Sequence, residues 1–136
     1  MKRKALIGIG IVSVALLIPI EQTVDVEVKV KPIAKARTKA TMEEKRQNRS
    51  DMARFAYAGW GWDKVQRNCL RKLWYQESRY DHFADNPKSS AYGIAQLLGE
   101  KSTDPHIQIL RGLRYIEHRY GTPCRAYKYH LRKNWY

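Results

Sequence analysis

The chain has 136 residues, which is enough for one domain and an appendage but not for two ordinary domains. Its 26 lysines and arginines against 13 acidic residues give a net charge of +13. This excess predicts an anionic partner or surface, such as nucleic acid, anionic lipid or an acidic wall polymer. Because the chain has only two cysteines, a cysteine-based zinc site is not expected.

The N-terminus has the pattern of an export signal. A basic cluster at residues 1–4 precedes an apolar run at residues 5–20 in which Ser13 is the only polar side chain. This run is short for a bilayer core of about 30 Å, and the residues after Leu17 form a poor cleavage site. A buried core helix is the alternative. We predict that residues 1–22 are either a cleaved signal peptide or a signal anchor, so that the protein is secreted or membrane-anchored outside the cytoplasm.

Residues 23–50 have the composition of a charged, flexible tether. The stretch VDVEVKVK alternates like a strand, but no second segment matches it, and an isolated strand is not stable. After Pro32 the chain has almost no large apolar side chains, so it cannot bury a core. We therefore predict that the folded domain occupies residues 51–136 and that Ser50 caps its first helix.

The patterns beyond residue 50 indicate four helices, over residues 50–61, 63–78, 104–121 and 122–133. Asp63 and Asp104 occupy N-cap positions, and Gly121 follows the third helix. Residues 80–93 are rich in turn formers, and residues 93–100 are a short apolar segment, either helical or irregular. No two segments show a convincing paired-strand pattern, so we predict a compact all-α domain.

Glu77 stands in an unusual place for a charged residue. It follows three residues spaced four apart on one face of the second helix: Val65, Cys69 and Leu73. A carboxyl group half-buried behind aromatic side chains has a raised pKa, which suits a general acid. We expect the residues after it to form a cleft around it. The alternative is a helix-end glutamate paired with Arg71 or Arg79.

The two cysteines, Cys69 and Cys124, both lie in the part predicted to be exported. Outside the cytoplasm a pair of thiols tends to oxidise, which predicts a disulfide. Closing a loop of this length contributes about 4 kcal/mol on the chain-entropy estimate. The alternative is two unpaired, buried cysteines.

Three short motifs share a family resemblance. Glu77-Ser78, the segment GIAQ at 93–96 and Ala126-Tyr127 resemble the Glu-Ser, Gly-Leu-Met-Gln and Ala-Tyr-Asn motifs of the soluble lytic transglycosylase (SLT, goose-lysozyme-like) family. Residues 60–136 are similar to a short variant in actinobacterial and phage cell-wall enzymes, which tends to carry both cysteines and a terminal Trp-Tyr. Two positions depart from the pattern: Ala95 replaces Met and Lys128 replaces Asn.

The resemblance implies a lysozyme-like helical fold and a lytic transglycosylase that acts on peptidoglycan. Such an enzyme cleaves the β-1,4 bond between N-acetylmuramic acid and N-acetylglucosamine. Most glycosidases use two carboxylates, whereas this family uses one, here Glu77, as acid and then as base. The product is a 1,6-anhydromuramic acid end, and neither water nor a cofactor is consumed.

The resemblance also suggests which residues bind the glycan. Gln96 is expected to bind or orient the sugar and Tyr127 to contact Glu77 or the sugar, while Tyr92 and Ser90 have weaker support. Asp81 is a candidate second carboxylate, although local capping is the favoured interpretation. The four histidines, at 82, 106, 118 and 130, lack metal-ligand spacing and are interpreted as surface or packing residues, so no metal is expected.

A second function is compatible with the same residues. A non-catalytic module that binds cell wall or another polyanion would use the basic charge and the aromatic side chains without cleavage. The export signal argues against nucleic acid as the main partner. We expect a monomer acting on peptidoglycan strands, of either cellular or phage origin.

Overall fold

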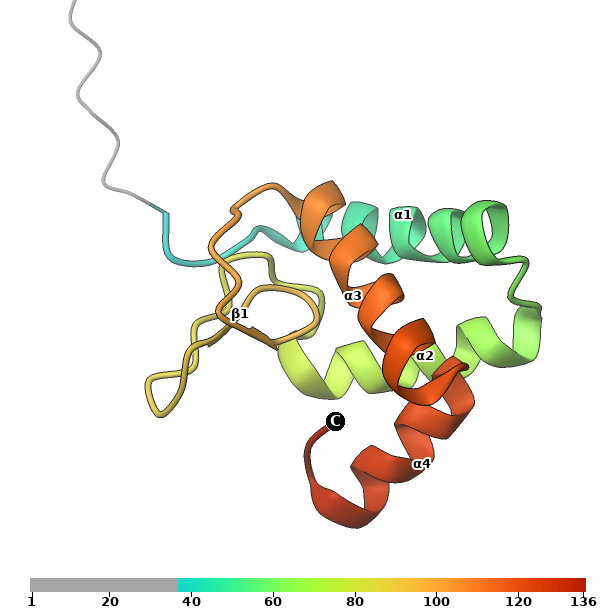
Figure 1. Ribbon diagram of the computed structural model, residues 1–136. Coiled ribbons are helices and arrows are strands. Elements are labelled where there is room, and N and C mark those ends of the chain that lie inside the picture. Colours follow the sequence, from blue (N-terminus) through green and yellow to red (C-terminus); the bar gives the residue numbers. More distant parts are fainter. Residues whose placement is uncertain (1–36) are drawn as a thin grey trace, which may run out of the picture. The chain divides into compact units, whose positions relative to one another are not determined.

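The computed structural model describes residues 37–136, in which four helices enclose a buried core (Figure 1). The elements, in chain order, are α1 (Met42–Trp60), α2 (Lys64–Ser78), β1 (Ala91–Tyr92), β2 (Leu97–Leu98), α3 (Pro105–Tyr120) and α4 (Pro123–Lys133). This mostly helical architecture is compatible with the predicted all-α class. The predicted signal at residues 1–22 lies outside the described residues, and so does the tether as far as residue 36. No helix within residues 37–136 has both the length and the apolar character needed to cross a membrane.

Helix α1 begins earlier than predicted. Its N-cap is Thr41, whose hydroxyl accepts a hydrogen bond from the Glu44 N–H, while the Glu44 carboxylate accepts one from the Thr41 N–H. This reciprocal capping box fixes the helix start nine residues before Ser50, which lies inside the helix. The prediction of Ser50 as N-cap is therefore wrong, and the expected boundary between tether and domain falls within α1.

Helices α2 and α3 begin where the sequence predicts. Asp63 caps α2 through the Gln66 N–H, and Asp104 caps α3 through the His106 and Ile107 N–H groups. The buried core contains one large aromatic side chain from α2 and aliphatic side chains from several elements, including Met52, Leu70, Leu73, Trp74, Ile94, Ile109, Leu113 and Ile116. Of the predicted apolar stripe on α2, Leu73 is fully buried, whereas Val65 is 63% exposed.

A close contact between α2 and α3 depends on Gly112. A Cβ atom at this position would lie 2.6 Å from Cζ2 of Trp74 and 2.8 Å from Cβ of Ala95. Such separations are too short for carbon atoms, so the two elements meet at this distance only because residue 112 has no side chain. Ala95 is itself buried here, and its small size therefore fits the contact with α3.

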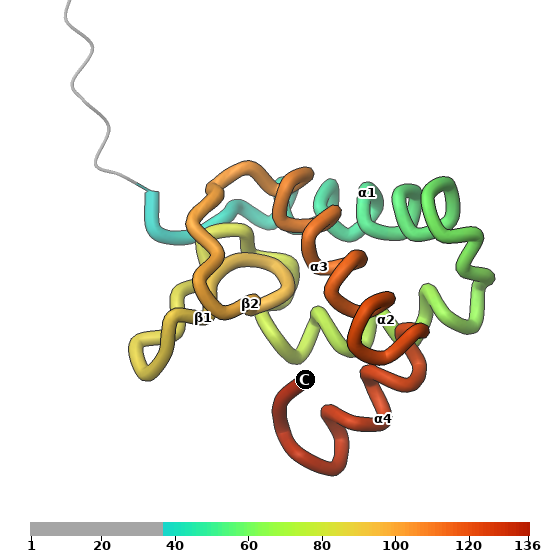
Figure 2. The backbone as a smooth tube through the Cα atoms, viewed as in Figure 1, coloured from blue at the N-terminus to red at the C-terminus, as the bar shows by residue number. Residues whose placement is uncertain are grey.

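A small hairpin follows α2. Its strands β1 and β2 are antiparallel, with Ala91 opposite Leu98 and Tyr92 opposite Leu97, and the GIAQ segment forms the connecting turn (Figure 2). The prediction that no strands pair is wrong here. Two residues per strand are too few to produce an alternating pattern, which is why the sequence gives no signal.

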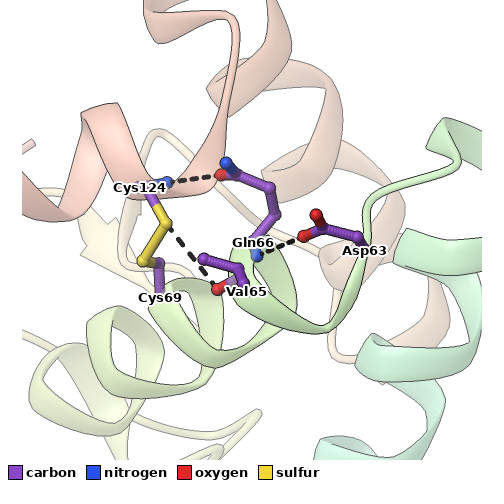
Figure 3. Close-up of a disulfide and its surroundings, with 5 residues drawn as sticks. All are labelled: Asp63, Val65, Gln66, Cys69 and Cys124. Carbon is purple, nitrogen blue, oxygen red and sulfur yellow. Dashed lines mark hydrogen bonds between the residues drawn. A yellow bond between two sulfur atoms is a disulfide. The ribbon is translucent and has the colours of Figure 1, made fainter.

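A disulfide joins α2 to α4, as the sequence predicts (Figure 3). The Cα atoms of Cys69 and Cys124 are 4.9 Å apart, so the alternative of two unpaired cysteines is wrong. Oε1 of Gln66 accepts a hydrogen bond from the Cys124 N–H at 2.9 Å. The Cys124 sulfur lies 3.7 Å from the Val65 carbonyl oxygen, a packing contact because a disulfide sulfur carries no hydrogen. These contacts hold the start of α4 against the first turn of α2.

Candidate active site

Glu77 lies in the last turn of α2 with its side chain toward α4. Its Oε1 atom is buried and lies 2.9 Å from Nδ1 of His130. The two atoms have the separation of a hydrogen bond but not its angles, and neither has a hydrogen-bond partner within residues 37–136. The side chain is 15% exposed, and Oε2 is not among its buried atoms, so one carboxyl oxygen reaches solvent.

Burial moves the pKa values of this pair in opposite directions. Loss of hydration raises the pKa of Glu77 from 4.5 to about 7 and lowers the pKa of His130 below 6.5. The distance alone would suggest an ion pair. Both shifts disfavour the charged forms, however, so we interpret the contact as one between a neutral carboxyl group and a neutral imidazole. A carboxyl group that stays protonated close to neutral pH can act as a general acid.

Neither arginine considered as a partner pairs with Glu77 in the described part of the chain. The Arg79 guanidinium lies 5.9 Å from the centre of the Tyr75 ring, and Arg71 makes no ion pair with a described residue. The alternative of a helix-end glutamate paired with Arg71 or Arg79 is therefore wrong.

Asp81 has a structural role. Its carboxylate accepts hydrogen bonds from the N–H groups of Ala40 and Phe83 and lies 3.1 Å from Nζ of Lys45. Although burial acts to raise the pKa of Asp81, the two N–H donors and Lys45 outweigh it and lower that pKa. An ionised, fully engaged carboxylate agrees with the capping interpretation and makes Asp81 a poor second catalytic acid.

Ser78 ties Glu77 to the GIAQ turn. Its hydroxyl donates a 2.7 Å hydrogen bond to the Ile94 carbonyl oxygen, while the Ile94 N–H donates to Oε1 of Gln108 at 2.9 Å. Gly93 adopts φ +77°, and a Cβ atom there would lie 2.3 Å from the same Gln108 oxygen. Glycine is thus required both by the backbone conformation and by the packing. The Glu-Ser and GIAQ motifs therefore meet in space.

The other predicted binding residues gather on this hairpin. The Gln96 amide donates to the carbonyl oxygens of Ala84 and Gly93, at 3.0 and 2.9 Å, so its nitrogen serves the turn itself. Ser90 accepts a hydrogen bond from Gly99 N–H, and Tyr92 is half-buried beside it. The structure therefore brings these three together, and their contacts with a sugar stay predictions.

On α4, His130 is the residue that contacts Glu77. Tyr127 packs against the hydrophobic core and makes no hydrogen bond with Glu77 or with any other described residue. His130 follows it by three positions, which places it on the same side of the helix. His130 is buried, which agrees with the packing half of its prediction, but its contact with Glu77 was not predicted. The three-residue spacing between Tyr127 and His130 was the feature of the sequence that could have indicated this contact. Lys128, at the departure from the Asn of the motif, is exposed.

Tyr136 belongs to the terminal Trp-Tyr pair, Trp135-Tyr136, that the family resemblance includes, but its contacts were not predicted. Its hydroxyl accepts a 2.9 Å hydrogen bond from Trp74 Nε1 and donates a 2.7 Å one to the Ala95 carbonyl oxygen. Burial raises the pKa of Tyr136 well above its usual value, and the nearby Glu77 carboxylate acts in the same direction. Tyr136 therefore lies within electrostatic reach of Glu77.

Two hollows in residues 37–136 lie between α1 and α2, and Glu77 lines neither of them. The GIAQ turn reaches the end of α2 through Ser78, and the Glu77 carboxyl group lies outside both of these hollows. The described residues contain no cluster of three or more His, Cys, Asp or Glu side chains suited to a metal ion. Comparison of the chain with protein-family models, with curated proteins and with solved structures gives no match.

Proposed function

We propose that the protein is a peptidoglycan lytic transglycosylase in which Glu77 is the catalytic acid and base. The observation that supports this best is the partly buried Glu77 carboxyl group, with a pKa of about 7 and no contact to a second carboxylate within residues 37–136. Its meeting with the GIAQ turn through Ser78 adds support, because the two motifs resemble those of the lytic transglycosylase family.

A single carboxyl group can complete the proposed reaction. Protonated Glu77 donates its proton to the glycosidic oxygen as the C1–O bond breaks, and the N-acetyl group of the muramic acid stabilises the positive charge at C1. The carboxylate then removes the proton from the C6 hydroxyl group as its oxygen bonds to C1. One proton enters and one returns, no water is used, and Glu77 ends protonated.

His130 has a positioning role in this proposal. Its neutral ring faces the buried Oε1 atom, which leaves Oε2 as the oxygen that meets the substrate. Gln96, Tyr127, Tyr92 and Ser90 are the proposed glycan contacts around it. The protein would work outside the cytoplasm, delivered by the signal or anchor at residues 1–22.

The test is digestion of purified peptidoglycan by the oxidised full chain, with mass spectrometry of the products. We expect fragments that end in 1,6-anhydromuramic acid, and we expect Glu77→Gln to lower their yield by at least about a hundredfold. Glu117→Gln is the matched control, because it removes one carboxylate yet keeps an oxygen to accept the Trp60 indole hydrogen bond.

The other outcomes each have a meaning. Reducing muramic acid ends would show hydrolysis instead of transglycosylation, and a second carboxylate would then be required. No cleavage with retained binding to the wall would favour the alternative, a non-catalytic wall-binding module. Two departures from the family motifs, Ala95 and Lys128, support that alternative.

A further inference from the structure

A basic groove lies between α1 and α2. Its main part has a volume of about 750 Å³, and an adjoining hollow of about 480 Å³ shares Arg46, Arg49 and Arg71 with it. The two hollows therefore lie side by side. Six cationic side chains line the main part: Lys45, Arg46, Arg49, Arg71, Lys72 and Arg79. One acidic side chain, Glu43, lines it as well.

Most of this charge is not neutralised. Glu43 pairs with Arg46, and Lys45 pairs with Asp81. The other four cations have no carboxylate partner within residues 37–136: Arg49, Arg71, Lys72 and Arg79. Four like charges that converge on one concave surface repel one another, so an anionic ligand there would be strongly favoured.

The cations come from both helices that border the groove, and Tyr80 is among the residues that line it. Tyr80 is buried, and its hydroxyl donates a hydrogen bond to the Arg71 carbonyl oxygen. Burial raises the pKa of Tyr80 to about 12, and the positive charges of Arg49 and Arg71 act in the opposite direction. One arginine from α1 and one from α2 therefore lie within electrostatic reach of the same hydroxyl group.

The groove is separate from the candidate active site. Helix α2 contacts both α1 and α4, which lie on opposite sides of it in Figure 1. Arg71 and Tyr75 face the α1 side, whereas Glu77 faces His130 on α4. A ligand in the groove would therefore leave Oε2 of Glu77 unobstructed.

We propose that this groove binds a linear phosphodiester polymer with small polyol units, of the poly(glycerol phosphate) type. Phosphate oxygens are strong acceptors for arginine and lysine, and a chain with one negative charge per repeat matches cations placed along both walls. The apolar edges, Met42 and Tyr75, are 82% and 54% exposed and offer contact for the carbon backbone of such a polymer.

Two other polyanions fit less well. Proteins that bind single-stranded nucleic acid present several aromatic faces on which successive bases stack, whereas Tyr75 is the one exposed aromatic side chain among the residues that line the main part of the groove, because Tyr80 is buried. Proteins bind an anionic membrane through a flat or protruding basic face, whereas these cations line a hollow. A base-free, flexible polymer avoids both difficulties.

The test measures binding of a fluorescent poly(glycerol phosphate) oligomer to the full chain by anisotropy. The groove variant is Arg49→Gln/Arg71→Gln/Lys72→Gln, in which all three side chains are exposed. The matched control, Arg114→Gln/Arg125→Gln/Arg132→Gln, removes the same charge from exposed positions on α3 and α4. We expect the groove variant to lose affinity by roughly tenfold or more and the control by less than about threefold.

Equal losses in the two variants, or no binding by the parent chain, would overturn the proposal. Tighter binding to oligothymidine of equal charge, or to phosphatidylglycerol vesicles, would also overturn it in favour of that partner. If the groove variant fails to fold, as judged by circular dichroism, the single changes Arg49→Gln and Lys72→Gln replace it. Glu77→Gln should bind the polymer like the parent, so this result is independent of the proposed catalysis.

Discussion

At Glu77, the position that suits a catalytic acid is unfavourable for the stability of a carboxylate. A carboxyl group is most stable when hydrated or paired, yet here Oε1 is buried beside a neutral imidazole. Asp81, four residues later, has two N–H donors and Lys45. The two acids therefore differ because of what surrounds them: one keeps its proton to about pH 7 and the other is held ionised.

The raised pKa of Glu77 predicts how stability depends on pH. The unfolded chain loses this proton near pH 4.5 and the folded chain near pH 7, so the folded state binds more protons in between. The free energy of unfolding should therefore fall as the pH rises through this window, by about 3 kcal/mol in total. Glu77→Gln removes this contribution. As the pH rises through the same window, the free energy of unfolding of the variant should therefore increase by that amount relative to that of the parent.

Urea unfolding of both proteins from about pH 4 to about pH 8 measures this difference. The lowered pKa of His130 works in the opposite direction, because the unfolded state then binds more protons. Taking the difference between the two proteins removes most of that contribution. A constant difference across the pH range would contradict the burial of a protonated Glu77.

At the scale of the elements, close contacts decide the arrangement. The Cys69–Cys124 disulfide and Gln66 hold α4 on α2, and Gly112 lets α3 approach Trp74. Gln66 also satisfies an N–H group in the first turn of α4, where the Thr122 side chain makes no capping hydrogen bond. A residue on one helix thus supplies the cap of another.

Gly112→Ala should destabilise the protein. The new methyl group would meet Trp74 and Ala95, and such overpacking costs about 1–3 kcal/mol. Gly59→Ala is the matched control, because Gly59 lies in α1 with no atom within 4 Å of the added carbon. This control should gain about 0.5–1 kcal/mol from reduced chain entropy. Equal effects in urea unfolding would show that the α2–α3 contact is looser than described.

At the scale of the whole molecule, the folded unit includes residues that composition assigns to a tether. Ala40 and Lys45 bind Asp81, and the Asn48 amide donates to the Tyr80 carbonyl oxygen. The first half of α1 therefore anchors the segment that follows α2. Low apolar content did not prevent folding, because polar contacts with a distant segment hold this part of the chain.

A chain that starts at residue 51 should therefore be much less stable than one that starts at residue 37. The shorter chain lacks Ala40 and Lys45, which leaves Asp81 with a buried charge and fewer partners, at a cost of about 3 kcal/mol or more. Loss of the Thr41–Glu44 capping box adds to this. Thermal unfolding of the two chains provides the measurement, and equal midpoints would refute a structural role for residues 37–50.

Local features of the chain could be predicted from sequence because they depend on neighbours within one turn. Asp63 and Asp104 cap their helices through such neighbours. The capping box in the sequence TMEE at 41–44 is equally local and could also have been predicted. The disulfide followed from two cysteines in a chain with an export pattern. Glu77 was singled out by its place at the end of an apolar stripe.

The tertiary structure decided the surroundings of those residues. The contact of His130 with Glu77, the insertion of Tyr136 beside Trp74 and the groove between α1 and α2 all join segments far apart in the sequence. Helical periodicity shows which side chains share a face, but not which face of another helix they meet. That choice depends on the packing of the whole core, where Gly112 and the disulfide set the distances between helices.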